Sequence, residues 1–292
     1  MKWYVIFIGC FLLACEHGHK ENIDIQGHRG ARGLAPENSL PGFILATELG
    51  VNTLELDLVV SADSQLIVSH EPFFSPEICL DEFGKAFPHD SIINIYKLDY
   101  SQIQLFDCGS KGNMRFPEQN RVSIYKPLLK DVIDSVESYI KSNGLDMINY
   151  NIELKTTLET DSVFHPHPET FSDLTYSLLK EMEILDRITI QSFDFRTLQY
   201  FHIHYSDVEL ALLIANELTW KANIDSLGFT PEIYSPYYLL LSQENVTELQ
   251  NAGMRVIPWT VNKSREIKNV LALGVDGIIT DYPNRAIEII NE

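Results

Sequence analysis

The chain has 292 residues, of which 45% are hydrophobic and 22% are charged, a composition typical of a globular protein with a sizeable core. A single α/β barrel of about 250 residues would take up most of this length. The formal net charge of −19 argues against nucleic acid or an anionic membrane surface as the main partner, because both require a basic surface. An anionic substrate would need a few local cations to hold it.

The N-terminus has one lysine followed by an apolar stretch of about eleven residues, which is typical of a signal peptide and too short to cross a bilayer. "LLAC" at 12–15 resembles a bacterial lipobox, in which the cysteine is lipidated and becomes the first mature residue. We therefore predict a lipoprotein signal peptide at 1–14, a tether at 15–22 with the lipid anchor at Cys15, and export to the periplasmic or surface face of the cell envelope. A buried N-terminal strand or helix is the alternative.

From residue 23 onward, short apolar runs typical of strands alternate with helical patterns. The expected strands are 23–26, 53–58, 65–69, 150–154, 188–191, 208–214, 232–235, 255–260 and 276–280. The expected helices include 40–49, 128–142, 170–182, 195–204, 242–252 and 264–273. This alternation predicts an α/β fold with a parallel sheet built from βα units.

Two of the expected strands are too close in sequence for a parallel connection. Only "SADS" separates 53–60 from 65–70, which suits a hairpin and is too short for a crossover. A turn centred on Ala62 and Asp63 would pair residue 60 with residue 65 and bring His70 beside Glu55. Eight strands remain without the return strand, so we predict a (β/α)8 TIM barrel over 23–292.

Residues 71–127 do not follow the alternation and are rich in Gly, Pro, Asn and Asp. Such a long segment after the second barrel strand predicts an insertion at the face where barrel enzymes keep their active sites. It is either a lid that selects the substrate or an inert elaboration. Cys79 and Cys108 both lie within it, as a disulfide suited to an exported protein or as two reduced, buried cysteines.

Ionisable residues stand on or just after several expected strands. They are His28, Arg29, Glu55, Asp57, His70, Glu153 and Lys155. Glu55 and Asp57 share one face of an apolar strand, and burying two unpaired carboxylates is costly, so they require a partner such as a metal ion or a cationic side chain. Because the strand ends of a barrel converge on one rim, we expect all of these residues to share a pocket.

The order of these motifs is similar to that of a known family. The stretches are "GHRGARGLAPENS" (27–39), "LELDL" (54–58), "SHEP" (69–72) and "IELK" (152–155), followed by "QSF" (191–193), "PWTVN" (258–262) and "DGIITDYP" (276–283). Together they resemble the glycerophosphodiester phosphodiesterases over essentially all of the expected mature chain. Glu71 stands where the family commonly has Asp, and Ser39 where Thr is commoner, and both keep the type of chemistry.

The resemblance implies that Glu55, Asp57 and Glu153 bind one divalent cation. An all-oxygen ligand set suits a hard ion, Ca²⁺ or Mg²⁺. It also implies that His28 and His70 are the general acid and base, because imidazole takes and gives protons near neutral pH.

The resemblance further assigns substrate contacts. Arg29 and Lys155 would bind the phosphate as local cations. Trp259 would either pack against the glycerol or alcohol moiety or be a buried tryptophan of the barrel. Glu37 would reach the metal or orient one of its ligands.

The implied reaction is metal-dependent hydrolysis of a small glycerophosphodiester to sn-glycerol 3-phosphate and an alcohol. The first attack on phosphorus comes either from a substrate hydroxyl, through a cyclic phosphate, or directly from water. Two alternatives stay open: a lipid-directed phosphodiesterase of the phospholipase D or phosphatidylinositol phospholipase C kind, and a non-catalytic surface lipoprotein that binds phosphodiesters. Activity on long-chain lipids would require an apolar surface on the 71–127 insertion.

Overall fold

The structure, a computed structural model, describes residues 23–292. The predicted signal peptide at 1–14 and the tether at 15–22 lie outside the described residues. No helix within the described part of the chain is both long and apolar enough to cross a membrane.

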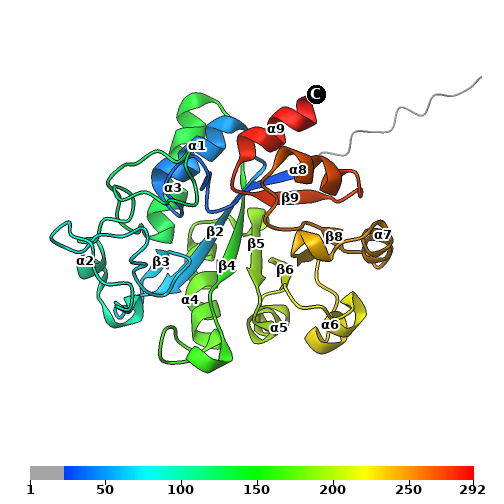
Figure 1. Cartoon of the computed structure of the whole chain (residues 1–292). Coiled ribbons are helices and arrows are strands. Elements are labelled where there is room, and N and C mark those ends of the chain that lie inside the picture. Colours follow the sequence, from blue (N-terminus) through cyan, green and yellow to red (C-terminus); the bar gives the residue numbers. More distant parts are fainter. Residues whose placement is uncertain (1–22) are drawn as a thin grey trace, which may run out of the picture.

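One sheet of nine strands forms the centre of the molecule (Figure 1). The strands are β1 (Asp24–Gly27), β2 (Thr53–Val60), β3 (Leu66–Val68), β4 (Asn149–Leu154), β5 (Ile188–Ser192), β6 (Glu209–Ile214), β7 (Ile233–Pro236), β8 (Arg255–Val256) and β9 (Gly277–Thr280). All except β3 pair in parallel in the order β8-β7-β6-β5-β4-β2-β1-β9. Asp276 N–H donates to the Val256 carbonyl and Ile279 N–H to the Pro258 carbonyl, which joins the two ends of this order. The predicted TIM barrel is confirmed.

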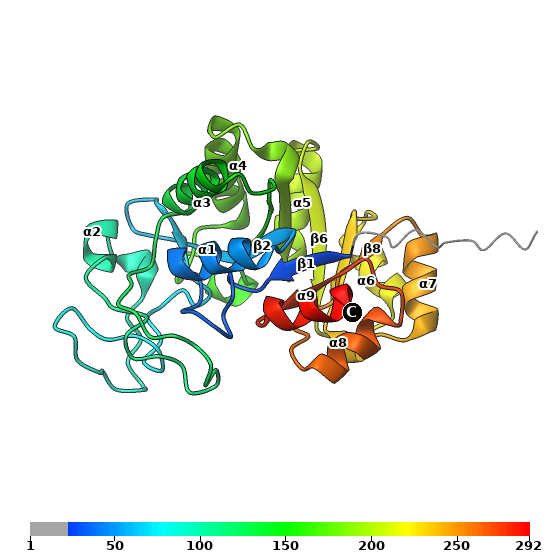
Figure 2. The ribbon, with the colours of Figure 1, turned by 90° about the horizontal axis from the view of Figure 1, so that it is seen from above.

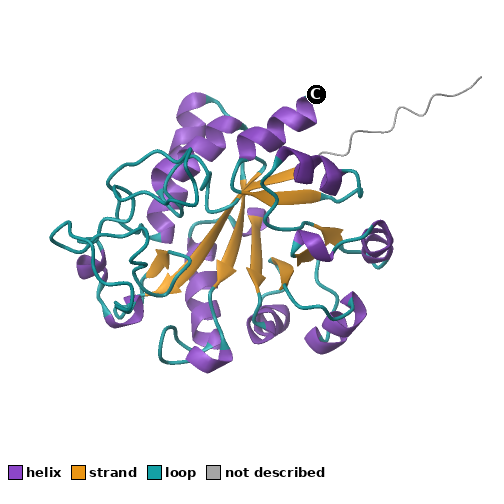
Figure 3. Ribbon diagram, in the orientation of Figure 1, coloured by secondary structure: helices purple, strands orange, loops and turns teal. Residues whose placement is uncertain are grey.

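Helices surround the strands on the outside (Figures 1 and 3). They are α1 (Leu40–Leu49), α3 (Leu129–Asn143), α4 (Pro168–Glu181), α5 (Phe195–His204), α6 (Trp220–Leu227), α7 (Gln243–Asn251), α8 (Ser264–Leu271) and α9 (Pro283–Asn291), with the short α2 (Tyr100–Ile103) in the insertion. The ends of α1 follow from its sequence: the Ser39 hydroxyl accepts from Gly42 N–H, and Gly50 ends the helix with a φ of 89°. The expected helices are present, and α6 and α9 are additional.

The interior of the barrel is polar on one side and apolar on the other. On β2, Leu54, Leu56 and Leu58 face outward into the layer between the strands and the helices, so Glu55 and Asp57 face inward. Asn151 and Gln191 are hydrogen-bonded to each other inside the barrel. On the opposite side, Ala211, Ile233, Ile257 and Ile279 form a small apolar cluster. The polar side is where the ionisable residues gather.

The hairpin of β2 and β3 is present, but its predicted register is wrong by one residue. Val60 pairs with Leu66 and Leu58 with Val68, so residue 60 does not face 65 and Glu55 does not face His70. The turn has three residues, 62–64, because Ser64 adopts a left-handed φ of 60° and its N–H donates to the Ser61 carbonyl. His70 lies beyond the end of β3, in the loop that begins the insertion.

The expected strand 255–260 is also shorter than predicted, with β8 ending at Val256. Pro258 has no N–H to donate, so the regular ladder stops there. Ile257 and Trp259 still donate to the carbonyls of Tyr234 and Pro236, which keeps the chain against β7 as far as the rim.

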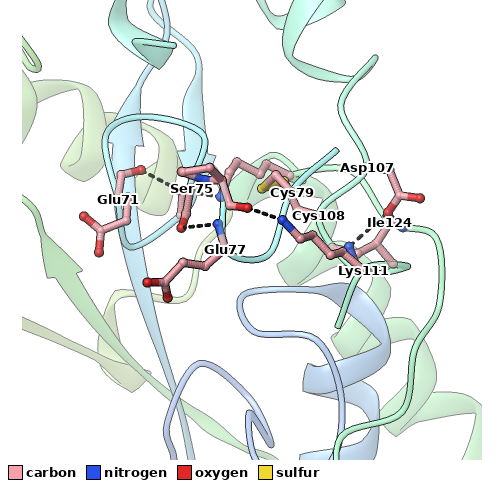
Figure 4. The surroundings of a disulfide bond; sticks show 12 residues. Glu71, Ser75, Glu77, Cys79, Asp107, Cys108, Lys111 and Ile124 are labelled. Atoms are coloured by element: carbon pink, nitrogen blue, oxygen red, sulfur yellow. Dashed lines mark hydrogen bonds between the residues drawn. A yellow bond between two sulfur atoms is a disulfide. The ribbon is translucent and has the colours of Figure 1, made fainter. Parts of the chain in front are cut away.

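The 71–127 insertion projects from one side of the barrel and is mostly loop (Figures 2 and 3). It has its own small core, in which Phe74, Ile95, Ile103 and Phe106 pack on the face of the hairpin that carries Val59 and Ile67. Cys79 and Cys108 form a disulfide within this core, so the first of the two alternatives for these cysteines holds in the structure. Figure 4 shows how it joins the segment after Glu71 to the segment beside Ile124, whose carbonyl accepts from Cys108 N–H.

Candidate active site

A cavity of about 360 Å³ opens at the carboxyl ends of the barrel strands. Its lining residues are His28, Arg29, Arg32, Glu55, His70, Glu71, Arg115, Glu153, Gln191, Phe193, Leu213, Trp259, Thr260 and Ile279. Asp57 and Lys155 lie just behind it, with Asp57 Oδ2 3.3 Å from Arg29 Nε and Lys155 Nζ 2.6 Å from Glu153 Oε1. The structure therefore brings all seven ionisable residues singled out in the sequence to one place.

Three buried carboxylates form the centre of the site. Glu55, Asp57 and Glu153 each have an oxygen within 4.8 Å of the others. The spacing on β2 puts the first two on one face, and the parallel register places Glu153 of β4 beside Asp57. Burial, reinforced by the neighbouring charges of Asp57 and Glu153, raises the pKa of Glu55 well above its usual range. Burial also opposes ionisation of Asp57, but Arg29, His70 and Lys155 outweigh it and hold the pKa of Asp57 well below its usual range.

The surroundings of these carboxylates leave an oxygen free for a cation. Glu55 accepts hydrogen bonds from the Gln191 amide at 2.7 Å and from Arg29 N–H at 2.8 Å. Asp57 Oδ2 accepts from the Asn38 amide at 2.8 Å, whereas its buried Oδ1 has no hydrogen-bond partner. The Lys155 amine lies 3.6 Å from this Oδ1, too far for a hydrogen bond. A buried carboxylate oxygen without a hydrogen bond is costly, and an all-oxygen set of this kind suits Ca²⁺ or Mg²⁺. The residues fit a hard divalent ion.

His28 follows β1 and is held by a buried acid from the other end of the chain. Its Nδ1 lies 2.6 Å from Oδ1 of Asp281, which follows β9, and its Nε2 lies 4.0 Å from Glu55 Oε2. Burial lowers the pKa of His28 to about 4, against the opposing charge of Asp281. Asp281 is itself bound by the Arg32 guanidinium at 2.7 and 3.1 Å and by the Asn262 amide at 2.7 Å. This network fixes the ring of His28.

His70 faces the same cavity from the start of the insertion. Its Nδ1 lies 2.7 Å from Glu71 Oε1. The carboxylate of the next residue in the chain thus orients the His70 ring. The buried amine of Lys126 donates a hydrogen bond of 2.8 Å to the hydroxyl of the preceding residue, Ser69. Burial lowers the pKa of Lys126 to about 8. The end of the insertion thus contributes to the segment that carries His70.

Arg29 and Lys155 are the cations nearest the carboxylates. Arg29 adopts a left-handed φ of 52°, which turns its N–H onto Glu55 while its guanidinium reaches Glu37 at 2.8 Å. Lys155 extends β4 and contacts Glu153 and, at 3.6 Å, Asp57. Glu37 binds arginine and lies apart from the carboxylate cluster of Glu55, Asp57 and Glu153.

An aromatic wall faces these charges. Trp259 donates its indole N–H to the Ser235 carbonyl at 2.9 Å, which fixes the ring at the rim. Phe193 meets it edge-on, with ring centroids 5.4 Å apart, and Leu213 completes the surface. This wall can hold the carbon skeleton of a small ligand.

Several site residues were not singled out from the sequence. They are Arg32, Asn38, Arg115, Lys126, Gln191 and Asp281. Arg32, Asn38, Gln191 and Asp281 lie inside the quoted motifs. A polar residue directly after a barrel strand is a usable signal for Asp281. Lys126 and Arg115 belong to the irregular insertion, where no periodicity indicates which side chains point inward.

The model of the "Glycerophosphoryl diester phosphodiesterase family" matches residues 28–285. The chain belongs to this family. A glycerophosphodiester phosphodiesterase of Bacillus altitudinis is 28% identical over 272 residues, covering 92% of this chain and 98% of the relative. The predicted family and its enzyme class, phosphodiesterase, are confirmed.

Solved structures agree with this membership. A crystal structure from Silicibacter pomeroyi superposes with a TM-score of 0.84 at 27% identity, covering 94% of this chain and 95% of that chain. A phosphodiesterase of Oleispira antarctica, solved in complex with the product sn-glycerol-3-phosphate, shares the fold with a TM-score of 0.73 at 20% identity, covering 92% and 97%.

Proposed function

We propose that this enzyme hydrolyses glycerophosphodiesters to sn-glycerol 3-phosphate and an alcohol, in a reaction that requires one divalent cation. The observation that carries the proposal is the cluster of Glu55, Asp57 and Glu153 in one cavity with two histidines and Arg29. The name of the Bacillus relative and the product held by the Oleispira neighbour support the choice of substrate.

Glu55, Asp57 and Glu153 would hold the cation, Ca²⁺ or Mg²⁺. When bound there, it would supply positive charge to a phosphoryl oxygen and offset the charge that grows in the transition state. Arg29 would bind another phosphoryl oxygen through its guanidinium, and Lys155 would add a second positive charge beside the carboxylates. These contacts orient the phosphodiester before the reaction.

His28 and His70 exchange protons in this scheme. Because Asp281 occupies Nδ1 of His28, Nε2 is the atom left to face the substrate. As a new P–O bond forms, one histidine takes the proton of the attacking hydroxyl. As the P–O bond to the leaving oxygen breaks, the other histidine gives that oxygen a proton. The same pair serves a substrate hydroxyl or a water molecule as the attacking group. Trp259 and Phe193 would pack against the glycerol or alcohol arm.

The test is release of glycerol 3-phosphate from glycerophosphocholine and glycerophosphoethanolamine with Ca²⁺, Mg²⁺ or EDTA. We expect release with one of the ions, none with EDTA, and a loss of about 10²–10⁴-fold in kcat in His28→Ala. Glu55→Gln should lose the metal dependence together with the activity. Undiminished release in EDTA would disprove the metal role. Absence of release with any ion, together with binding of glycerophosphocholine, would favour the non-catalytic binding lipoprotein.

A lipid-directed phosphodiesterase is the second candidate, and one observation favours it. The insertion exposes large apolar side chains, namely Phe83, Ile92, Leu105, Met114, Val122 and Tyr125. A relative from Rattus norvegicus that is 24% identical over 286 residues is named lysophospholipase D. Higher kcat/KM on lysophosphatidylcholine than on glycerophosphocholine would establish this reading, and the reverse ranking would exclude it.

We also propose that the mature enzyme is exported and anchored by lipid at Cys15. The lipobox-like "LLAC" supports this, and a disulfide suits an oxidising compartment. Cys15→Ala should abolish labelling by fatty acid and move the protein from the membrane fraction to the soluble fraction. Unchanged labelling would place any lipid on another residue.

A further inference from the structure

Three arginines line the active-site cavity, and two of them are neutralised internally. Arg29 is paired with Glu37 and Asp57, and Arg32 with Asp281. The third, Arg115, forms no ion pair with any residue in the described range 23–292, and its guanidinium carbon lies 6.0 Å from the centroid of the Phe116 ring. Among the described residues, it is therefore the cavity arginine without a carboxylate partner.

The backbone that carries Arg115 is firmly attached to the barrel. Phe116 is buried against Tyr282 and lies under the Arg32 guanidinium, 4.7 Å from its ring centroid. The Gln119 amide donates to the Arg32 carbonyl at 2.7 Å, and Asn120 N–H to the Leu34 carbonyl at 2.8 Å. The loop that follows β1 thus holds this part of the insertion at the rim, although the Arg115 side chain is exposed.

Arg115 and the aromatic wall come from different parts of the fold. The wall is built from residues on or after β5, β6 and β8, whereas Arg115 belongs to the insertion between β3 and α3. Figures 1 and 2 show the insertion on the far side of the molecule from α6 and α7. A phosphodiester has two arms, so a substrate with its phosphate at Arg29 can place one arm on the wall and the other toward Arg115.

We propose that Arg115 determines specificity by pairing with an anionic group on the alcohol arm of the substrate. The inference rests on the proposed function and extends it to a substrate class: glycerophosphodiesters whose alcohol carries a phosphate or carboxylate. A guanidinium binds such oxygens with two parallel hydrogen bonds. The other two cavity arginines already pair with carboxylates, whereas Arg115 pairs with none in residues 23–292, so the charge of Arg115 can be balanced by a group on the substrate.

The experiment compares two substrates that differ by one phosphate, glycerophosphoinositol 4-phosphate and glycerophosphoinositol, with the full chain. The ratio of their kcat/KM values isolates the effect of the added charge. We expect the ratio to fall about fivefold in Arg115→Gln, the upper end of the range for an exposed ion pair. The value of kcat/KM for glycerophosphoinositol, which cannot form this pair, should fall less. Arg115→Lys keeps the positive charge but cannot form two parallel hydrogen bonds, so its ratio should lie between those of the wild type and Arg115→Gln.

The matched control is Arg265→Gln, at an exposed arginine of α8 that does not line the cavity, and it should leave the ratio unchanged. An equal loss on both substrates in Arg115→Gln would overturn the proposal, because Arg115 would then bind the common glycerol phosphate. An unchanged ratio would overturn it as well. If the wild type hydrolyses neither substrate nor glycerophosphocholine, the proposed function itself fails, and this inference fails with it.

Discussion

At the scale of single residues, Asp281 is the side chain on which His28 most depends. Its carboxylate is buried and bound by His28, Arg32 and Asn262. Burial opposes its ionisation, but His28 and Arg32 keep the pKa of Asp281 well below its usual range. The Asp281 carboxylate is thus ionised at neutral pH.

Asp281→Asn should lower kcat by about 10²–10⁴-fold, because the amide no longer fixes the ring or stabilises its protonated form. Asp281 raises the pKa of His28, whereas burial and Arg32 lower it. Removing the charge should therefore move the limb of the pH–kcat profile that His28 governs toward lower pH. The measurement is the profile of this variant beside Asp225→Asn, an exposed control on α6. A loss of kcat with an unmoved limb would assign Asp281 a purely structural role.

Lys126 makes stability depend on pH in a predictable direction. Its pKa is about 8 in the folded protein, because of burial, against an ordinary value of 10.5. Between these values the unfolded chain binds a proton that the folded chain does not, so stability rises with pH. Relative to Lys126→Met, the wild type should gain up to about 3 kcal/mol in the free energy of unfolding from pH 7 to pH 10.5.

Urea unfolding at pH 7, 8.5 and 10.5 measures this difference in the free energy of unfolding. Lys141→Met, at an exposed position on α3, is the control and should keep a constant offset from the wild type. If the free energies of unfolding of the wild type and Lys126→Met change with pH in parallel, the pKa of Lys126 is not lowered in the folded protein and the prediction is wrong.

Much of the site was predictable residue by residue, because period-two spacing and strand ends are local signals. Glu55 and Asp57 were expected on one face, as were Glu153 and Lys155, and the structure places them together. The bond between His28 and Asp281 spans 253 residues and exists only because β1 pairs with β9. No local pattern contains that information.

At the scale of elements, the disulfide controls how firmly the insertion is held. It closes a loop with a sequence separation of 29 residues, and this loop begins eight residues after Glu71. In the chain-entropy model such a loop is worth about 3–4 kcal/mol. Lys111, whose amine donates to the Pro76 carbonyl, provides a second connection between the same two segments.

Cys79→Ser/Cys108→Ser should therefore expose the insertion to local unfolding, while most of the barrel stays folded. We expect much faster tryptic cleavage after Lys85 and Lys97, and a lower kcat because the segment carrying His70 loosens. Limited proteolysis and kinetics measure both effects, and the wild type under reducing agent should behave alike. Cleavage at the wild-type rate would mean that the small core alone holds the segment.

Helices whose ends are marked by capping residues were predicted well, whereas turns and irregular segments were not. The sequence placed α1 and α5 at their observed bounds. The hairpin register was missed because Ser64, a residue with a side chain, takes a left-handed conformation that usually indicates glycine. Turn geometry of this kind depends on contacts made after the strands pair.

At the scale of the whole molecule, the negative net charge of the chain opposes binding of the anionic substrate that we propose. The net charge of −19 repels an anionic phosphodiester over long distances, so the proposed function depends on the local cations and on the metal ion that we propose at the three carboxylates. The barrel was predictable because a sequence of eight alternating strands and helices is typical of the (β/α)8 fold. How the insertion lies on the rim was not predictable, because its contacts with the barrel follow no periodic pattern in the sequence.

Cation binding by the three carboxylates can be measured without any substrate, by calorimetric titration of Ca²⁺ and of Mg²⁺ into the wild type and Asp57→Asn. We expect one site per chain for at least one ion, weakened at least about tenfold in the variant, because one of three carboxylates is lost. Failure of both ions to bind, or equal binding by the variant, would contradict a metal centre at Glu55, Asp57 and Glu153.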